Sequence, residues 1–149
     1  MTTEVQIRAD LQSPTLAEAK QHLRVTHNED DTYIQSLINA ATAEREDSTG
    51  IALRQIAAIY TGTTPSNFLP VFLPYRPIAS VTAVTVNGQP VGYTLQGNKV
   101  FPTSAWQAGT VKITFTATPN GVVQSTDSIA ILHRVAYLYV NRGDENDRG

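Results

Sequence analysis

The sequence has 149 residues, of which 41% are hydrophobic and 16% are charged, with a formal net charge of −2. A chain of this size fits one globular domain and buries roughly two-thirds of its extended surface on folding. The absence of cysteine excludes disulfides, thiolate catalysis and zinc sites built on sulfur. The small net charge disfavours a surface devoted to nucleic acid, and no apolar run reaches the roughly 18 residues of a membrane helix. The first residues also lack the basic and apolar segments of a signal peptide.

Charge is distributed unevenly along the chain. Residues 1–50 carry nine acids and four bases, a net charge of −5, whereas residues 51–125 carry four bases and no acid. The remaining residues carry four acids and three bases. Composition changes at the same boundaries, from Ala/Glu-rich to Val/Thr/Pro/Gly-rich and back. This pattern predicts helices, then a sheet, then a helix.

Two helices are predicted in the acidic N-terminal part. Thr15 and Glu18 form a capping box at the start of the first helix. Asn28 is expected to cap the second helix, whose first turn then contains Glu29–Asp31, where the helix dipole favours acids. Gly50 ends this helix because glycine readily adopts the left-handed conformation of a C-cap.

The middle of the chain shows the two-residue period of β-strands. Asn87-Gly88 predicts a tight hairpin, since both central residues of such a turn require positive φ. The expected fold of this part is a compact antiparallel meander of about five or six strands. The predicted strands cover residues 55–61, 71–73, 78–86, 91–95, 99–101 and 111–117.

A third helix is predicted from Ser125 to about Asn141. It is apolar on most sides, which is unusual for a helix that faces solvent. Either it is the central helix of the fold, or a neighbouring molecule covers part of it.

The sequence contains no convincing catalytic, cofactor or metal site. His22 and His27 lack the spacing of a helical metal pair, and His133 lies on the apolar third helix. Ser125 and His133 could belong to a Ser–His–Asp site, but no nucleophile elbow accompanies them. The acids of Glu29–Asp31 lack the pattern of a calcium loop. We therefore expect no catalytic residues, no cofactor and no bound metal.

A cluster of acids lies in the last turn of the second helix. The negative end of the helix dipole lies there and disfavours acids, so this position is unusual for them. Such departures are usually compensated by another contact. The acids would contact either the basic sheet of the same chain or the basic sheet of another copy. A head-to-tail contact between copies closes into a ring or continues as a filament. The candidate interface residues are Glu44, Glu46, Asp47, Arg54, Arg76, Lys99 and Lys112.

Several segments, in order, resemble the head–tail connector (adaptor) proteins of long-tailed double-stranded DNA bacteriophages. Residues 16–25 and 34–41 are similar to the N-terminal part of family members. Residues 46–50 and Leu53 are similar to the segment that follows it. The proline-rich entry into the sheet resembles residues 73–81, and the closing helix resembles residues 136–142. Together these segments cover most of residues 15–142.

The resemblance implies an α+β fold in a single connector domain, a small helical bundle with an antiparallel sheet between the second and last helices. The expected parts are N-terminal helices (1–53), a β insertion (54–118), a C-terminal helix (125–142) and a flexible tail (143–149). It also implies a non-enzymatic virion protein at the head–tail junction, assembled in the bacterial cytoplasm.

The partners that the resemblance implies are copies of the chain in a ring, commonly twelvefold in the virion, and the portal protein above it. A head-completion or tail protein would follow below, and double-stranded DNA would pass through without specific contacts; no membrane is involved. Little sequence follows Arg142, although the family often contacts the portal through a C-terminal helix or arm. The candidate portal contacts are Tyr137, Tyr139, Asn141, Arg142, Asp144 and Arg148.

Two other classes of function stay open at this point. One is a different virion component, such as a capsid decoration protein or a tail terminator. The other is a small hydrolase or carbohydrate-binding module that uses Trp106 and Tyr93 as a stacking platform.

Overall fold

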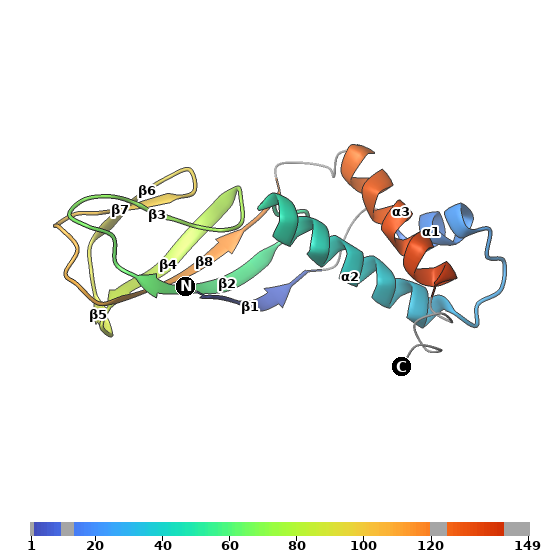
Figure 1. The fold of residues 1–149 in the computed structure, drawn as a ribbon, viewed down its shortest axis with the longest axis horizontal. Helices are drawn as coiled ribbons and strands as arrows, with labels where there is room; N and C mark the ends of the chain where they lie inside the picture. Colours follow the sequence, from blue (N-terminus) through green and yellow to red (C-terminus); the bar gives the residue numbers. More distant parts are fainter. Residues whose placement is uncertain (1, 10–13, 120–124, 142–149) are drawn as a thin grey trace. The chain divides into compact units, whose positions relative to one another are not determined.

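The structure, a computed structural model, describes residues 2–9, 14–119 and 125–141 (Figure 1). The chain divides into two compact units, each formed by two separate stretches of sequence. The sheet unit comprises residues 1–10 and 50–120, and the helical unit comprises residues 11–49 and 121–149. The predicted α+β class, with antiparallel strands between the second and last helices, is confirmed. The predicted tail, residues 143–149, lies outside the described residues.

The sheet unit contains eight described strands in two antiparallel sheets. The larger sheet has the order β1-β2-β8-β4-β5, and the smaller has the order β3-β7-β6. The strand bounds are β1 (Thr2–Arg8), β2 (Ile56–Thr63), β3 (Val71–Phe72), β4 (Ile78–Val86), β5 (Gln89–Pro90), β6 (Tyr93–Gln96), β7 (Lys99–Pro102) and β8 (Thr110–Ala117).

The strand order of the larger sheet is not that of the predicted meander. β8, the last strand in the sequence, lies between β2 and β4, so Phe115 is opposite both Ala58 and Val81. β8 alternates apolar and polar residues, and its burial alternates in step, so one face of the strand packs on the core and the other faces away from it. The sequence pattern gives the strands but not this order.

β1 was not predicted, because its residues fall in the segment assigned to the N-terminal helices. It pairs antiparallel with β2, with a bulge between Val5 and Ile7, and forms one edge of the larger sheet. The Arg8 guanidinium donates a hydrogen bond to the Tyr75 hydroxyl at 3.3 Å. The bulge leaves the side chain of Ile7 66% exposed, while Val5 packs against the core.

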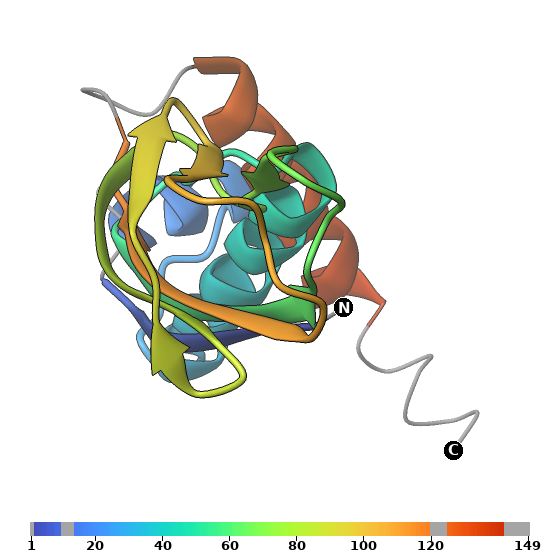
Figure 2. The same ribbon diagram turned by 90° about the vertical axis from the view of Figure 1, so that its left-hand side faces the viewer.

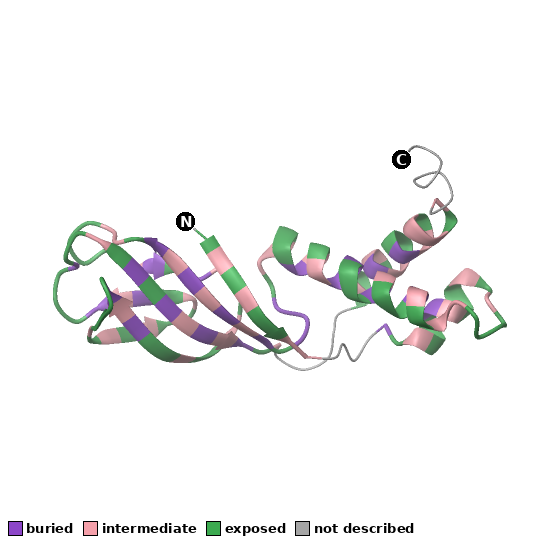
Figure 3. Cartoon of the chain, turned by 90° about the horizontal axis from the view of Figure 1, so that it is seen from below, coloured by how far each residue is buried: buried purple, intermediate pink, exposed green. Residues whose placement is uncertain are grey.

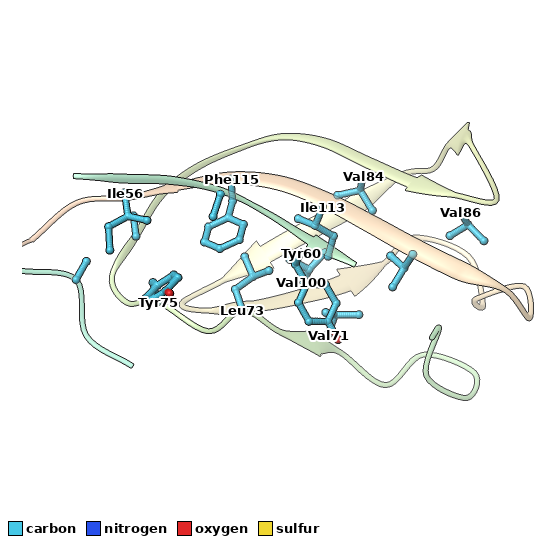
Figure 4. Packing of buried hydrophobic residues seen from close by; sticks show 14 of the residues in the cluster. Ile56, Tyr60, Val71, Leu73, Tyr75, Val84, Val86, Val100, Ile113 and Phe115 are labelled. Carbon is cyan, nitrogen blue, oxygen red and sulfur yellow. The ribbon is translucent and has the colours of Figure 1, made fainter. Parts of the chain in front are cut away.

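Both sheets contribute to one hydrophobic core (Figure 4). Ile56, Ile113 and Phe115 of the larger sheet and Val71 and Val100 of the smaller sheet are each at most 3% exposed. Burial of such a side chain contributes about 1.5–3 kcal/mol to folding. In Figure 2, which views this unit end-on, β6 and β7 arch over the longer strands.

The predicted Asn87-Gly88 hairpin turn is confirmed, with both residues at positive φ (51° and 83°). The Asn87 side chain also fixes the turn, since its Oδ1 accepts a hydrogen bond from the Thr110 N–H at 3.0 Å. The turn therefore joins β4 to β5 and, through Thr110, to the start of β8.

The helical unit consists of α1 (Leu16–Leu23), α2 (Asp31–Thr49) and α3 (Ser125–Val140). Thr15 is the N-cap of α1, as predicted, because its Oγ1 accepts a hydrogen bond from the Glu18 N–H at 3.2 Å. The Glu18 carboxylate accepts a hydrogen bond from the Thr15 hydroxyl at 3.2 Å, so only the Thr15 half of the capping box is shown. α2 packs against both α1 and α3. Among the described residues, no helix is long and apolar enough to cross a membrane.

The predicted start of α2 is wrong by two residues. α2 begins at Asp31, so Asn28 is not its N-cap and, of the three acids, only Asp31 lies in the first turn. Lys20 accounts for the difference: its Nζ donates to Asn28 Oδ1 at 2.7 Å and forms an ion pair with Asp31 Oδ1 at 2.7 Å. The Asn28 side chain thus bonds to a neighbouring helix instead of to the α2 backbone.

Candidate interaction surfaces

The three acids at the end of α2 lie in different environments. Glu44 is exposed and accepts two hydrogen bonds from the Arg134 guanidinium, at 2.9 and 3.2 Å. Asp47 is also exposed, whereas Glu46 is fully buried. Glu46 follows Thr42 by four residues, which places it on the buried face of the helix. Only Glu44 and Asp47 of this cluster therefore have exposed side chains.

The bases of the sheet unit differ in the same way. Arg76, Lys99 and Lys112 are exposed, whereas Arg54 is only 7% exposed. The Lys99 ammonium lies 5.6 Å from the centre of the Phe72 ring, within the range of a cation–π contact. The exposed interface candidates are thus two acids of the helical unit and three bases of the sheet unit.

The described residues of the two units carry opposite net charges. The sheet unit has five bases and one acid, a net charge of +4. The helical unit has four bases and eight acids, a net charge of −4. The two units are therefore complementary in net charge.

α3 is not the central helix of the fold. Ile131 and Val135 face the interior of the helical unit and are at most 1% exposed. Ile129, Tyr137 and Val140 form a second, exposed stripe, with exposures of 51%, 57% and 75%. Figure 3 shows exposed positions interspersed with buried ones along the helices. This exposed stripe accounts for the apolar character of the helix and favours the alternative in which a neighbouring molecule covers it.

The candidate portal contacts at the end of α3 differ in their exposure and in their hydrogen bonds. Tyr137 is exposed, with the Arg134 guanidinium 5.3 Å from its ring centre. Tyr139 is half-buried and donates a hydrogen bond to Asp30 Oδ2 at 2.6 Å. Asn141 donates through its side chain to the Tyr137 carbonyl at 2.8 Å. The other three candidates, Arg142, Asp144 and Arg148, lie outside the described residues.

A groove of about 320 Å³ lies between α2 and α3, and we call it the α2–α3 groove. Ala41 and Ile131 are among the lining residues, but their side chains are buried, at 2% and 1% exposed. The Glu44–Arg134 ion pair lies at its side. The groove is lined by Ala41, Glu44, Arg45, Ser48, Ala130, Ile131 and Arg134.

A second apolar surface lies in the sheet unit and was not predicted. Phe68, Leu69 and Phe72, which we call the loop patch, are 57%, 61% and 59% exposed. These residues lie in the loop before β3 and in β3 itself. Three large apolar residues beside prolines could have indicated an exposed apolar surface. The sequence analysis instead assigned this segment to a strand that is short or at an edge.

The described residues offer little for catalysis. The His22 and His133 rings lie 5.9 Å apart, and no group of three or more potential metal ligands occurs within the described ranges. A cavity of about 460 Å³ beside Trp106 has no ionisable side chain among its lining residues. The stacking platform is not favoured either, since Trp106 is 9% exposed and its indole N–H donates to the Leu69 carbonyl.

Comparison with solved structures gives the same fold in chains of gene transfer agent (GTA) particles. A chain in the neck of an empty GTA particle, computed with C6 symmetry, matches with 23% identity and a TM-score of 0.74. That match covers 94% of this chain and 84% of the other. A chain in the neck of the native particle, computed with C12 symmetry, matches with 20% identity and a TM-score of 0.60, over 91% and 84% of the two chains.

The sequence comparisons show the family. No curated protein matches the sequence significantly. The profile of the phage gp6-like head–tail connector proteins matches residues 13–87, which is just over half of the chain. The chain therefore belongs to the gp6-like head–tail connector family of phages, and its role is that of a structural connector.

Proposed function

We propose that this protein is a non-enzymatic adaptor that forms a ring beneath the portal, extends the DNA channel and joins the head to the tail. The proposal rests on the family and, above all, on the opposite net charges of the two units, +4 and −4. Charges of opposite sign on different units favour a head-to-tail contact, and such a contact closes into a ring when its rotation allows. The matched neck structures, computed with C6 and C12 symmetry, agree with a ring in those particles.

Lateral contacts in this ring would join the acidic end of α2 to the exposed bases of the next sheet unit. Glu44 and Asp47 supply the acids, and Arg76, Lys99 and Lys112 supply the bases. Exposed charge pairs contribute little energy individually, so their main effects are on the encounter rate and on orientation. The buried Glu46 and Arg54 are assigned no direct part in this contact.

The end of α3 would contact the portal. Tyr137 and Val140 expose apolar surface there, and aromatic residues are common anchors at protein interfaces. A head-completion or tail protein would bind the opposite side of the ring, and double-stranded DNA would pass through the channel without base-specific contacts. Assembly would take place in the host cytoplasm, with the finished ring in the virion.

The decisive experiment mixes the chain with the portal protein of the same phage and images the product by cryo-electron microscopy. We expect a stoichiometric ring on the portal. Asp47→Lys should weaken assembly, because it places a base opposite bases. Glu29→Lys, which changes the charge equally at an exposed position outside the proposed interface, should not.

Three results would oppose the proposal. Normal assembly of Asp47→Lys across a salt series would show that the interface assignment is wrong. Binding to capsid faces would favour a decoration protein, and binding to the tail tube would favour a tail terminator.

A further inference from the structure

The side chains of two histidines lie next to each other in the helical unit. His22 is in the last turn of α1 and His133 is in α3, and these two helices are in contact (Figure 1). The centres of the two rings are 5.9 Å apart, and the angle between the ring planes is 37°. Sequence spacing related His22 only to His27 and so indicated no metal site, because His133 lies far away along the chain.

The ring nitrogens of this pair are free to bind a ligand. Within the part of the chain that the structure describes, neither imidazole takes part in a hydrogen bond or an ion pair. A neutral imidazole has one nitrogen with a free lone pair, and that lone pair can bind a metal ion. Since both side chains are exposed, the pair offers two nitrogen donors at a position that solvent ions can reach.

The separation of the two rings fits a pair of imidazoles that bind the same ion. A metal–nitrogen bond of about 2.0–2.1 Å places the ion about 3.2 Å from each ring centre. The two ring centres are then about 5.2 Å apart at a tetrahedral angle, and about 6.4 Å apart when the two ligands lie opposite each other. The observed 5.9 Å lies between these limits, so rotation of the two exposed side chains is enough to direct both nitrogens at one ion.

The charges around the pair favour a cation. The described residues of the helical unit have a net charge of −4, and a negative surface raises the local concentration of cations. Three bases lie within two residues of either histidine. Lys20 and Arg134 are paired with acids, and Arg24 is the C-cap that follows α1. The last turn of α1, which contains His22, also carries the negative end of the helix dipole.

We propose that His22 and His133 together bind one divalent transition-metal ion, Zn²⁺, Ni²⁺ or Cu²⁺, between α1 and α3. Imidazole nitrogen suits these ions, whereas Mg²⁺ and Ca²⁺ prefer oxygen ligands. Cu²⁺ binds most tightly of the three, as it does at most nitrogen sites. The described residues add no third histidine or carboxylate to the pair, so water fills the remaining coordination positions.

A shared ion links two helices that are distant in the sequence. Only the folded chain brings the two rings together, so binding of the ion stabilises the helical unit. His133 is four residues after Ile129 and four before Tyr137, which places it on the same face of α3 as the exposed stripe. The ion therefore fixes the helix that carries the proposed portal contact, although its binding does not depend on that function.

Copper binding to the full chain, prepared without a polyhistidine tag, tests the site. Isothermal titration calorimetry with Cu²⁺ gives the stoichiometry and the dissociation constant, and electron paramagnetic resonance gives the number of bound nitrogens. His22→Ala and His133→Ala each remove one proposed ligand. His27→Ala is the matched control, since His27 is also exposed but lies outside α1 and α3.

We expect one ion per chain, with two nitrogen ligands in the resonance spectrum. His22→Ala and His133→Ala should each leave one nitrogen and raise the dissociation constant by roughly tenfold or more. His27→Ala should bind Cu²⁺ as the unchanged chain does. Zn²⁺ should raise the thermal midpoint of the unchanged chain and of His27→Ala but not those of the other two variants, with circular dichroism to confirm that every variant is folded.

Several results would overturn the inference. Absence of measurable binding, or equal affinity in the unchanged chain and in His22→Ala or His133→Ala, would show that the pair holds no ion. A single nitrogen ligand in the unchanged chain would show that the two rings do not share one. One ion per two chains, with a dimer in analytical ultracentrifugation, would place the ligands on different molecules. All of these measurements use the chain alone, so they are decided separately from ring formation on the portal.

Discussion

Replacing Trp106 by phenylalanine tests whether this residue holds the loop patch in place. Trp106→Phe keeps an aromatic ring in a site that is 9% exposed but removes the donor to the Leu69 carbonyl. The lost hydrogen bond costs about 0.5–1.5 kcal/mol, and the space left by the smaller ring adds a cost of similar size. We expect the free energy of unfolding to fall by about 1–2.5 kcal/mol.

Urea denaturation measures the global effect, and hydrogen exchange measures the local one. With a slope of about 2 kcal/mol per M urea, the midpoint should fall by about 0.5–1.3 M. The Leu69 amide, which donates to the Ser66 carbonyl, should exchange faster because the turn that protects it is less restrained.

Tyr93→Phe is the matched control. It also removes one hydrogen bond to a backbone carbonyl, that of Val81 at 2.9 Å, but it lies away from the loop patch in the sequence. Because the ring is kept, we expect a smaller loss of stability, about 0.5–1.5 kcal/mol, and no faster exchange at Leu69. Equal exchange at Leu69 in both variants would refute the role given to Trp106.

Three further predictions concern the two units. Ile131→Ala should lower the free energy of unfolding by about 2–5 kcal/mol, whereas the half-exposed Ile129→Ala should change it by less than about 0.5 kcal/mol, both measured by urea titration. Burial raises the pKa of the Tyr60 hydroxyl above its usual value of 10.0, so above pH 10 the folded chain keeps a proton that the unfolded chain loses. The free energy of unfolding should therefore fall as the pH rises past 10. Thermal melts at alkaline pH should show a smaller fall for Tyr60→Phe. A double-mutant cycle on Glu44 and Arg134 should give a coupling of only about 0.2–1 kcal/mol, since both side chains are about half exposed; a coupling well above this range would contradict the assignment as a surface pair.

Local sequence signals predicted the local elements well. The N-cap at Thr15, the Asn87-Gly88 turn and the alternation of β8 each depend on residues close together in the sequence. Features that depend on residues of another helix or strand were missed. β1 pairs with a strand about 50 residues later, and Asn28 is bonded to Lys20 on another helix.

The candidate surfaces were predicted only in part, because charge alone does not reveal burial. Glu44 and Asp47 are exposed, but Glu46, between them in the sequence, is on the inward face of the helix. The helical period would have indicated this, since Glu46 follows Ile38 by eight residues and Thr42 by four. The exposure of Phe68 and Leu69 depends on the hydrogen bonds from Trp106, which no local pattern contains.

The position of β8 has a consequence for protein synthesis. β2 and β4 are separated by a strand that the ribosome makes only after both of them. Until residues 110–117 emerge, the inner edges of β2 and β4 have no partner, and such edges are prone to pair with other chains. The nascent sheet therefore cannot close from its N-terminal end, and the edges of β2 and β4 stay open to other nascent chains until β8 has been synthesised.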